Sequence, residues 1–196
     1  MTHAPIPDHL GDPNNDVPIL NIPNILTLAR LALVPVFGYL ALFAEQTTTA
    51  QWSAAIVFLV AALTDLIDGV WARRYGLVTN FGKIADPIAD KALIGTALVA
   101  LSIRGEISWW VTGIILFREV AITVMRFWVI KHGVIPASRG GKLKTVSQIV
   151  AIVAFLVPMS GWVDVVAQVS LGIALALTIT TGIDYILKAR FLPDKT

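Results

Sequence analysis

Four aspartates lie inside two hydrophobic stretches of the chain, where charged side chains are least expected. Asp65 and Asp68 are three residues apart, and Asp86 and Asp90 are four apart, so each pair shares one face of a helix. Carboxylates that converge in an apolar interior repel one another unless protons, basic side chains or metal ions offset their charge. The spacing therefore predicts a reaction site or a charge pathway rather than a structural role.

The residue types favour a site for hard divalent cations. The chain has no cysteine and only three histidines, none of them near the aspartates in the sequence, so Mg²⁺ or Mn²⁺ fits better than Zn²⁺. Arg73 and Lys91 are the only basic residues expected close by. Four carboxylates at two depths are enough to hold two ions, an arrangement suited to a displacement at phosphorus. The alternative that this pattern leaves open is a proton or cation relay in a transporter.

Two antiparallel helices must bring these aspartates together. We expect the helices to be joined by a short turn within residues 75–80. Asp65 and Asp90 are then both about 13 Å from the turn, at about 1.5 Å of helix rise per residue. Asp68 and Asp86 form a shallower layer, so the four carboxylates are expected to converge.

The composition places this helical pair in a membrane. Of the 196 residues, 56% are apolar and 14% are charged, whereas an average soluble domain has about 25% charged residues. The mean hydropathy is +0.76. Hydrophobic segments occupy residues 24–44, 52–74, 82–104, 107–131, 143–161 and 163–188. Because each can cross a hydrocarbon layer of about 30 Å, we expect an all-α polytopic membrane protein with six transmembrane helices.

The charge distribution predicts how this bundle is oriented. We expect a six-helix domain at residues 21–190, between a disordered cytoplasmic tail at 1–20 and a short C-terminal tail at 191–196. Uncharged runs at 145–163 and 165–183 are the clearest spans. Ten basic residues flank one end of the bundle, against Arg104 at the other: Arg73, Arg74, Lys83, Lys131, Arg139, Lys142, Lys144, Lys188, Arg190 and Lys195. This asymmetry predicts a multi-pass protein of a bacterial cytoplasmic (inner) membrane, with both termini cytoplasmic.

A longer pattern surrounds the aspartates. Eight positions resemble the signature of the CDP-alcohol phosphotransferase family: Asp65, Asp68, Gly69, Ala72, Arg73, Gly82, Asp86 and Asp90. The resemblance implies that family's six-helix fold, with its active site at the cytoplasmic side. It also implies that the four aspartates bind two ions of Mg²⁺ or Mn²⁺, and that Asp90 takes the proton from an acceptor alcohol. Members of the family are expected to form homodimers among membrane lipids, and no nucleic acid is expected as a partner.

The same resemblance implies a binding site for CDP-diacylglycerol. Its expected contacts are Asn24, Thr27, Arg30, Gly69, Ala72, Arg73, Thr79 and Gly82. Pro23 and Asn24 have a second explanation, because such residues often begin a helix, and the two roles can coexist.

The acceptor is expected to bind nearer the C-terminus. Residues 117–120 and 141–148 resemble those of family members that transfer a phosphatidyl group from CDP-diacylglycerol to sn-glycerol 3-phosphate, releasing CMP. A phosphate monoester carries nearly two negative charges and needs basic partners. The residues expected to bind this phosphate are Arg118, Arg139, Lys142 and Lys144, with Arg126 as a further candidate.

Several alternatives remain open for this second region. Glu119 is expected to orient one of the bases, whereas Arg118 has the alternative of an ion pair with Glu119 or Asp184. The loop bases have the alternative role of setting membrane orientation. Inositol phosphate and phosphatidylglycerol are alternative acceptors within the same family.

Overall fold

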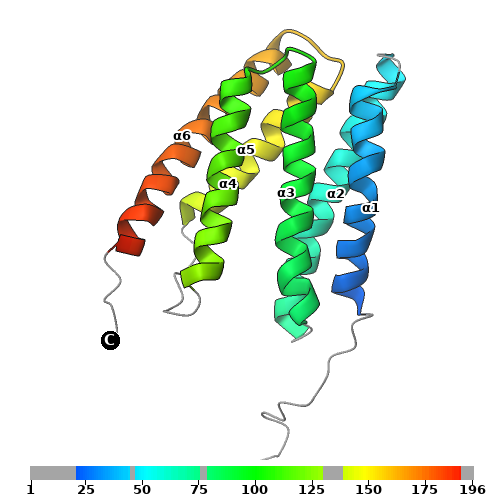
Figure 1. Cartoon of the computed structure of the whole chain (residues 1–196). Coiled ribbons are helices and arrows are strands. Elements are labelled where there is room, and N and C mark those ends of the chain that lie inside the picture. The colour runs from blue at the N-terminus through cyan, green and yellow to red at the C-terminus, as the bar shows by residue number, and fades with distance from the viewer. Residues whose placement is uncertain (1–20, 45–46, 76–78, 130–138, 191–196) are drawn as a thin grey trace, which may run out of the picture.

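The computed structural model describes residues 21–44, 47–75, 79–129 and 139–190, and in these ranges every regular element is a helix. Figure 1 shows their arrangement. The helices are α1 (Ile22–Leu42), α2 (Thr48–Tyr75), α3 (Asn80–Ile103), α4 (Trp109–Val129), α5 (Arg139–Leu156) and α6 (Trp162–Arg190). The expectation of an all-α chain with six helical segments is therefore confirmed.

The helices form two groups that meet along α3. Helix α1 packs against both α2 and α3, whereas α6 packs against both α4 and α5. Contacts of α2 with α5, and of α3 with α4 and α5, join the two groups (Figure 1). Successive helices run in opposite directions, so α1, α3 and α5 begin at one end of the bundle (Figure 1). Residues in the first halves of these three helices therefore lie toward the same end.

Side-chain caps explain where α1 and α3 begin. The Oδ1 atom of Asn21 accepts a hydrogen bond from the backbone N–H of Asn24 at 3.0 Å. The Oγ1 atom of Thr79 accepts one from the N–H of Gly82 at 2.9 Å. The helix start expected at Pro23 and Asn24 is confirmed, with Pro23 in the first turn, but Asn21 supplies the capping side chain. Such caps satisfy N–H groups that have no partner within the helix.

Helix α5 is shorter than the fifth expected segment, 143–161, and ends at Leu156. Pro158 lacks a backbone N–H and disfavours helical geometry at the residue before it, so it favours the end of the helix at this point. The uncharged run 145–163 is therefore not one continuous helix. By length and composition, two parts of the described chain suffice to cross a membrane, Asn24–Leu42 and Trp162–Tyr185. The second contains the uncharged run 165–183.

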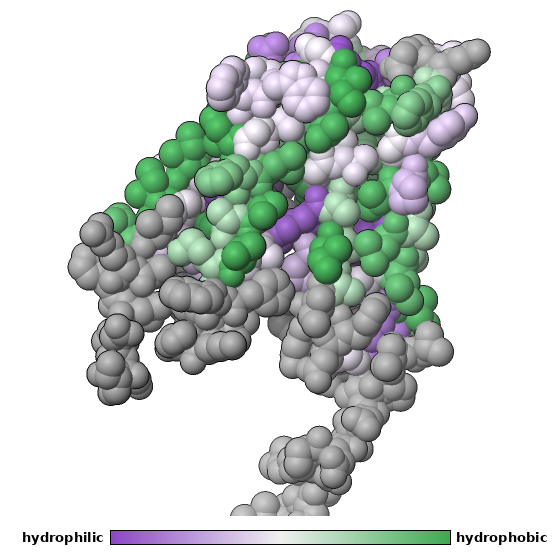
Figure 2. All heavy atoms as spheres, viewed as in Figure 1, coloured by the Kyte–Doolittle hydropathy of each residue, from purple (hydrophilic) through white to green (hydrophobic). Residues whose placement is uncertain are grey.

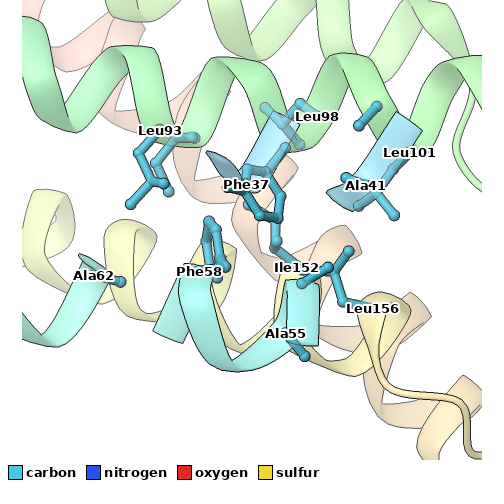
Figure 3. Close-up of a cluster of buried hydrophobic side chains, with 14 of the residues drawn as sticks. Phe37, Ala41, Ala55, Phe58, Ala62, Leu93, Leu98, Leu101, Ile152 and Leu156 are labelled. Carbon is cyan, nitrogen blue, oxygen red and sulfur yellow. The ribbon is translucent and has the colours of Figure 1, made fainter. Parts of the chain in front are cut away.

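An apolar core fills the half of the bundle in which α1, α3 and α5 end (Figure 3). Phe37 of α1 and Phe58 of α2 are fully buried, and their ring centroids are 5.5 Å apart. Most of the other core residues are leucine, isoleucine or alanine from α2, α3 and α5. Buried alanines allow close helix packing, and a Cβ added to Gly38 of α1 would lie 3.3 Å from Thr96 Cγ2 of α3. The other half of the interior is left for polar groups.

Truncation of Phe58 tests this core. We expect Phe58→Ala to lower the free energy of unfolding by about 3 kcal/mol, because it leaves a cavity against Phe37. Reversible unfolding in mixed detergent micelles measures the change. Phe117→Ala is the matched control, because that ring is 77% exposed. Equal losses of stability in the two variants would contradict the assignment of Phe58 to the core.

Candidate active site

The first three turns of α1 carry three buried polar side chains on one face. Asn24, Thr27 and Arg30 are three residues apart, and none is more than 2% exposed. Buried polar groups need hydrogen-bond partners. They form hydrogen bonds with residues of α2 and α3 and with the capping residue of α3. This face of α1 therefore joins the two helices that carry the four aspartates.

Arg30 neutralises the first aspartate. Its Nη1 atom lies 2.7 Å from Asp65 Oδ1, and its Nε–H donates to the carbonyl oxygen of Ala61 at 3.2 Å. The expectation that Arg73 and Lys91 are the only basic residues near the aspartates is therefore wrong. Arg30 is 35 residues from Asp65 in the sequence, so helix spacing alone could not reveal the pair. The motif resemblance did place Arg30 in the site.

Asp86 lies beside a space that Gly82 leaves open. Thr27 Oγ1 donates to Asp86 Oδ1 at 2.5 Å, and Thr79 Oγ1 donates to Asn24 Oδ1 at 2.9 Å. A Cβ added to Gly82 would lie 2.9 Å from Asn24 Oδ1 and 3.2 Å from Thr79 Oγ1. It would also lie 3.7 Å from Asp86 Oδ2. Glycine is thus required by this close approach.

The donor chemistry of this region fits a hard divalent cation. Amide, hydroxyl and carboxylate oxygens surround Gly82, and oxygen atoms are the ligands that Mg²⁺ and Mn²⁺ prefer. Within the described ranges, however, no three acidic or histidine side chains are arranged to hold a metal ion. The side chain of Asp68 lies outside the described residues. The four-aspartate metal site therefore remains a prediction.

A second charged cluster joins α4, α5 and α6. Glu119 forms ion pairs with Lys144 and with Arg118, the latter at 3.2 Å between Nη1 and Oε1. Arg118 Nη2 also donates to Thr181 Oγ1 of α6 at 2.9 Å. The alternative of an ion pair between Arg118 and Glu119 is therefore present, and Glu119, which was expected to orient one of the bases, contacts two of them. Lys144 is only 4% exposed, so its charge needs this partner.

Asp90 is close to both charged regions. Its carboxylate experiences the charges of Asp65, Lys91, Glu119 and Lys144. Lys91 Nζ donates to the carbonyl oxygen of Pro87 at 3.4 Å, one turn earlier in α3. Figure 2 shows hydrophilic residues in a hollow between the two groups of helices. The acid-rich region, which contains Asp65 and Asp86, and the base-rich region, which contains Lys144 and Arg118, therefore both lie near this one carboxylate.

Some expected site residues are not part of this arrangement. Lys142 is exposed near the beginning of α5, apart from the buried cluster around Lys144. Asp184 is exposed on α6. The remaining expected side chains lie outside the described residues: Asp68, Gly69, Ala72, Arg73, Arg126 and Arg139. Their roles stay predictions.

A cavity of about 400 Å³ lies at the opposite end of the bundle, near the connections between α3 and α4 and between α5 and α6. Gln51, Arg104, Glu106 and Asp164 are among its lining residues. Burial raises the pKa of Glu106, although the Arg104 guanidinium 2.6 Å away acts in the opposite direction. None of the expected site residues lines this cavity.

Comparison with known proteins defines the class of the chain. A family model described as CDP-alcohol phosphatidyltransferase matches residues 20–180. The chain belongs to the CDP-alcohol phosphatidyltransferase family. The family resemblance expected from the eight-position pattern is therefore confirmed, and the chain is an enzyme of the phosphatidyltransferase class.

Three curated relatives share most of their length with this chain. A Mycobacterium tuberculosis protein named probable phosphatidylglycerophosphate synthase is 52% identical over 173 residues, covering 87% of this chain and 82% of the relative. The CDP-diacylglycerol–glycerol-3-phosphate 3-phosphatidyltransferase of Bacillus subtilis is 37% identical over 184 residues, covering 87% and 95%. The Rickettsia typhi protein of the same name is 38% identical over 170 residues, covering 84% and 94%.

Gly82→Ala tests the open space beside Asp86. We expect phosphatidyltransferase activity to fall by about tenfold or more, because the new methyl group displaces Asn24 and Thr79 from their positions. Activity in detergent micelles is the measurement, alongside the thermal unfolding temperature. Gly172→Ala is the control, because a Cβ there meets nothing within 4 Å. Full activity of Gly82→Ala would show that this space is not needed.

Proposed function

We propose that this enzyme transfers the phosphatidyl group of CDP-diacylglycerol to sn-glycerol 3-phosphate, forming phosphatidylglycerophosphate and CMP. One observation carries the proposal: the charges of Asp65, in the acid-rich region, and of Lys144, in the base-rich region, both act on Asp90. The first suits a metal-assisted nucleotide donor, and the second suits an anionic acceptor. The names of the curated relatives support the same reaction. They give no support to the alternative of a transporter.

The donor is proposed to bind between α1, α2 and α3. A buried hydrogen bond holds the side chains of Asn24 and Thr79 beside Gly82, and Thr27 donates to Asp86 close by. Gly69, Ala72 and Arg73 are proposed to complete the CDP-diacylglycerol site, together with Arg30. Small residues leave room for the nucleotide, while the acyl chains stay in the surrounding lipid.

The acceptor phosphate is proposed to bind the bases of α4 and α5. Lys144 and Arg118 share the single carboxylate of Glu119, so this cluster carries one net positive charge. Charge-assisted hydrogen bonds from both bases suit a phosphate monoester. Arg139 and Lys142, which stand at the beginning of α5, are proposed to attract the dianion before it reaches them.

The proposed chemical step is a displacement at phosphorus. The oxygen of the acceptor's terminal hydroxyl bonds to the phosphorus that carries diacylglycerol, and the bond from that phosphorus to CMP breaks. CMP leaves with the electron pair, and Asp90 accepts the hydroxyl proton. Asp65, Asp68, Asp86 and Asp90 would hold two divalent ions, Mg²⁺ or Mn²⁺, which offset phosphate charge and acidify the hydroxyl when bound.

The proposal also specifies the setting of the reaction. All six helices are proposed to span a bacterial inner membrane, with both termini and the site at the cytoplasmic face. The ten-to-one distribution of basic residues supports this orientation. A soluble acceptor then reaches the site from the cytoplasm, while the lipid donor enters from the bilayer. A homodimer is proposed from the family resemblance.

An acceptor panel tests the reaction. The purified protein, CDP-diacylglycerol and Mg²⁺ or Mn²⁺ are combined with glycerol 3-phosphate, inositol phosphate or phosphatidylglycerol, and CMP release is measured. We expect CMP release above background with glycerol 3-phosphate, because its phosphate matches the basic cluster and its hydroxyl reaches Asp90. Release with another acceptor alone would refute the choice of acceptor. Flux of ions across vesicles without CMP release would instead favour a transporter.

Asp90→Asn tests the proposed base. We expect turnover to fall by at least about a hundredfold, because the amide cannot accept the hydroxyl proton. Binding of CDP-diacylglycerol, measured by equilibrium binding in micelles, should persist. Asp164→Asn is the matched control, because this exposed carboxylate lies at the opposite end of the bundle. Wild-type turnover in Asp90→Asn would refute the assignment.

A further inference from the structure

A buried glutamine lies next to the basic cluster of Lys144 and Arg118, and its amide nitrogen has no hydrogen-bond partner among the described residues. This residue, Gln148 of α5, is 2% exposed, and the nitrogen concerned is Nε2. Native proteins leave few buried donors unpaired. Neither donor binding nor proton transfer, as proposed above, uses this side chain. An unpaired buried amide of this kind is typical of a group that a ligand completes.

The position of Gln148 in α5 directs it to the base-rich region. It follows Lys144 by one helical turn on the same face, and that face continues with Ile152 and Leu156 of the apolar core. Gln148 is therefore the last polar residue before the core begins. Arg118 of the same cluster also has a buried nitrogen, Nε, without a partner among the described residues. The amide nitrogen of Gln148 and Nε of Arg118 are thus two donors available to a ligand beside the ion pairs of Glu119.

Gln148 and the proposed base both lie toward the end of the bundle at which α3 and α5 begin. Gln148 is nine residues from the beginning of α5, and Asp90 is ten residues from the beginning of α3. These helices begin at the same end of the bundle and contact each other (Figure 1). Lys144, one turn before Gln148, is close enough to Asp90 for its charge to act on that carboxylate, so an acceptor bound by Lys144 would lie near both residues.

We propose that Gln148 determines acceptor specificity by donating its amide N–H to the central hydroxyl of the acceptor. This inference rests on the proposed function and extends it to the part of the acceptor that does not react. A neutral amide suits a neutral hydroxyl oxygen, whereas the cations Lys144 and Arg118 suit the phosphate. The substrate class is a three-carbon phosphate with a free hydroxyl next to the reacting carbon. A site built this way disfavours an analogue that lacks the hydroxyl, because the amide is then left unpaired.

The test removes the proposed hydrogen bond in two ways: by a substrate without the central hydroxyl, and by a variant without the Gln148 amide. The substrates are sn-glycerol 3-phosphate and 3-hydroxypropyl phosphate, which lacks the central hydroxyl, and the readout is kcat/KM for CMP release. We expect the wild-type protein to prefer glycerol 3-phosphate by about tenfold or more. Gln148→Leu should lower kcat/KM for glycerol 3-phosphate by a similar factor and leave the analogue unchanged. The preference of this variant should then approach one.

Two further variants separate this role from a structural one. Gln168→Leu, at an exposed position of α6, should keep the wild-type preference. Gln148→Met, whose flexible side chain fits a buried space more easily, replaces Gln148→Leu if that variant does not fold. An equal loss with both acceptors, or a wild-type protein without preference, would overturn the inference and leave the proposed function standing. No CMP release from the wild-type protein with any acceptor would overturn both.

Discussion

The requirement to neutralise charge inside an apolar bundle governs this structure. Arg30 is fully buried, and its guanidinium reaches both Asp65 and the carbonyl oxygen of Ala61, so α1 is tied to α2 at a charged site. Glu119 does the same for the second group, because its carboxylate pairs with Lys144 of α5. A buried charge that lost its partner would be strongly destabilising. Each helix group therefore depends on an ion pair that also shapes the candidate site.

The apolar half of the interior positions the helices, and the polar half contains the candidate site. Phe37 and Phe58 pack in the half where α1, α3 and α5 end, and that packing defines the positions of the helices. The half where these helices begin contains hydrogen-bonded polar groups around Gly82 and Asp90. Reactive groups need fixed positions, but space must remain beside them because substrates must enter. The rigid packing of the apolar half holds the helices in position, so the polar half does not need to be filled completely.

The sequence predicted the helices and named polar residues for the candidate site, but it could not predict which side chains those residues contact. Hydrophobic runs located all six helices, and only the end of α5 differed clearly, because Pro158 stops the helix inside an uncharged run. The motif resemblance identified Arg30, Asn24 and Thr27 as site residues. Their contacts with Asp65, Thr79 and Asp86 join segments far apart in the chain. Spacing along one helix carries no information about such pairs, and it could not show that Lys142 is exposed while Lys144 is buried.

If the phosphate binds at Lys144 and Arg118 as proposed, the arrangement around Glu119 explains how such a buried anion site can exist before its ligand arrives. Two cations without an anion between them would repel each other and resist burial. Glu119 removes most of that cost, because one carboxylate pairs with both Lys144 and Arg118. The remaining single positive charge still attracts a phosphate, but the phosphate must compete with Glu119 for both bases. Competition of this kind weakens binding, and weak binding suits a transferase whose phosphorylated product must leave the same site.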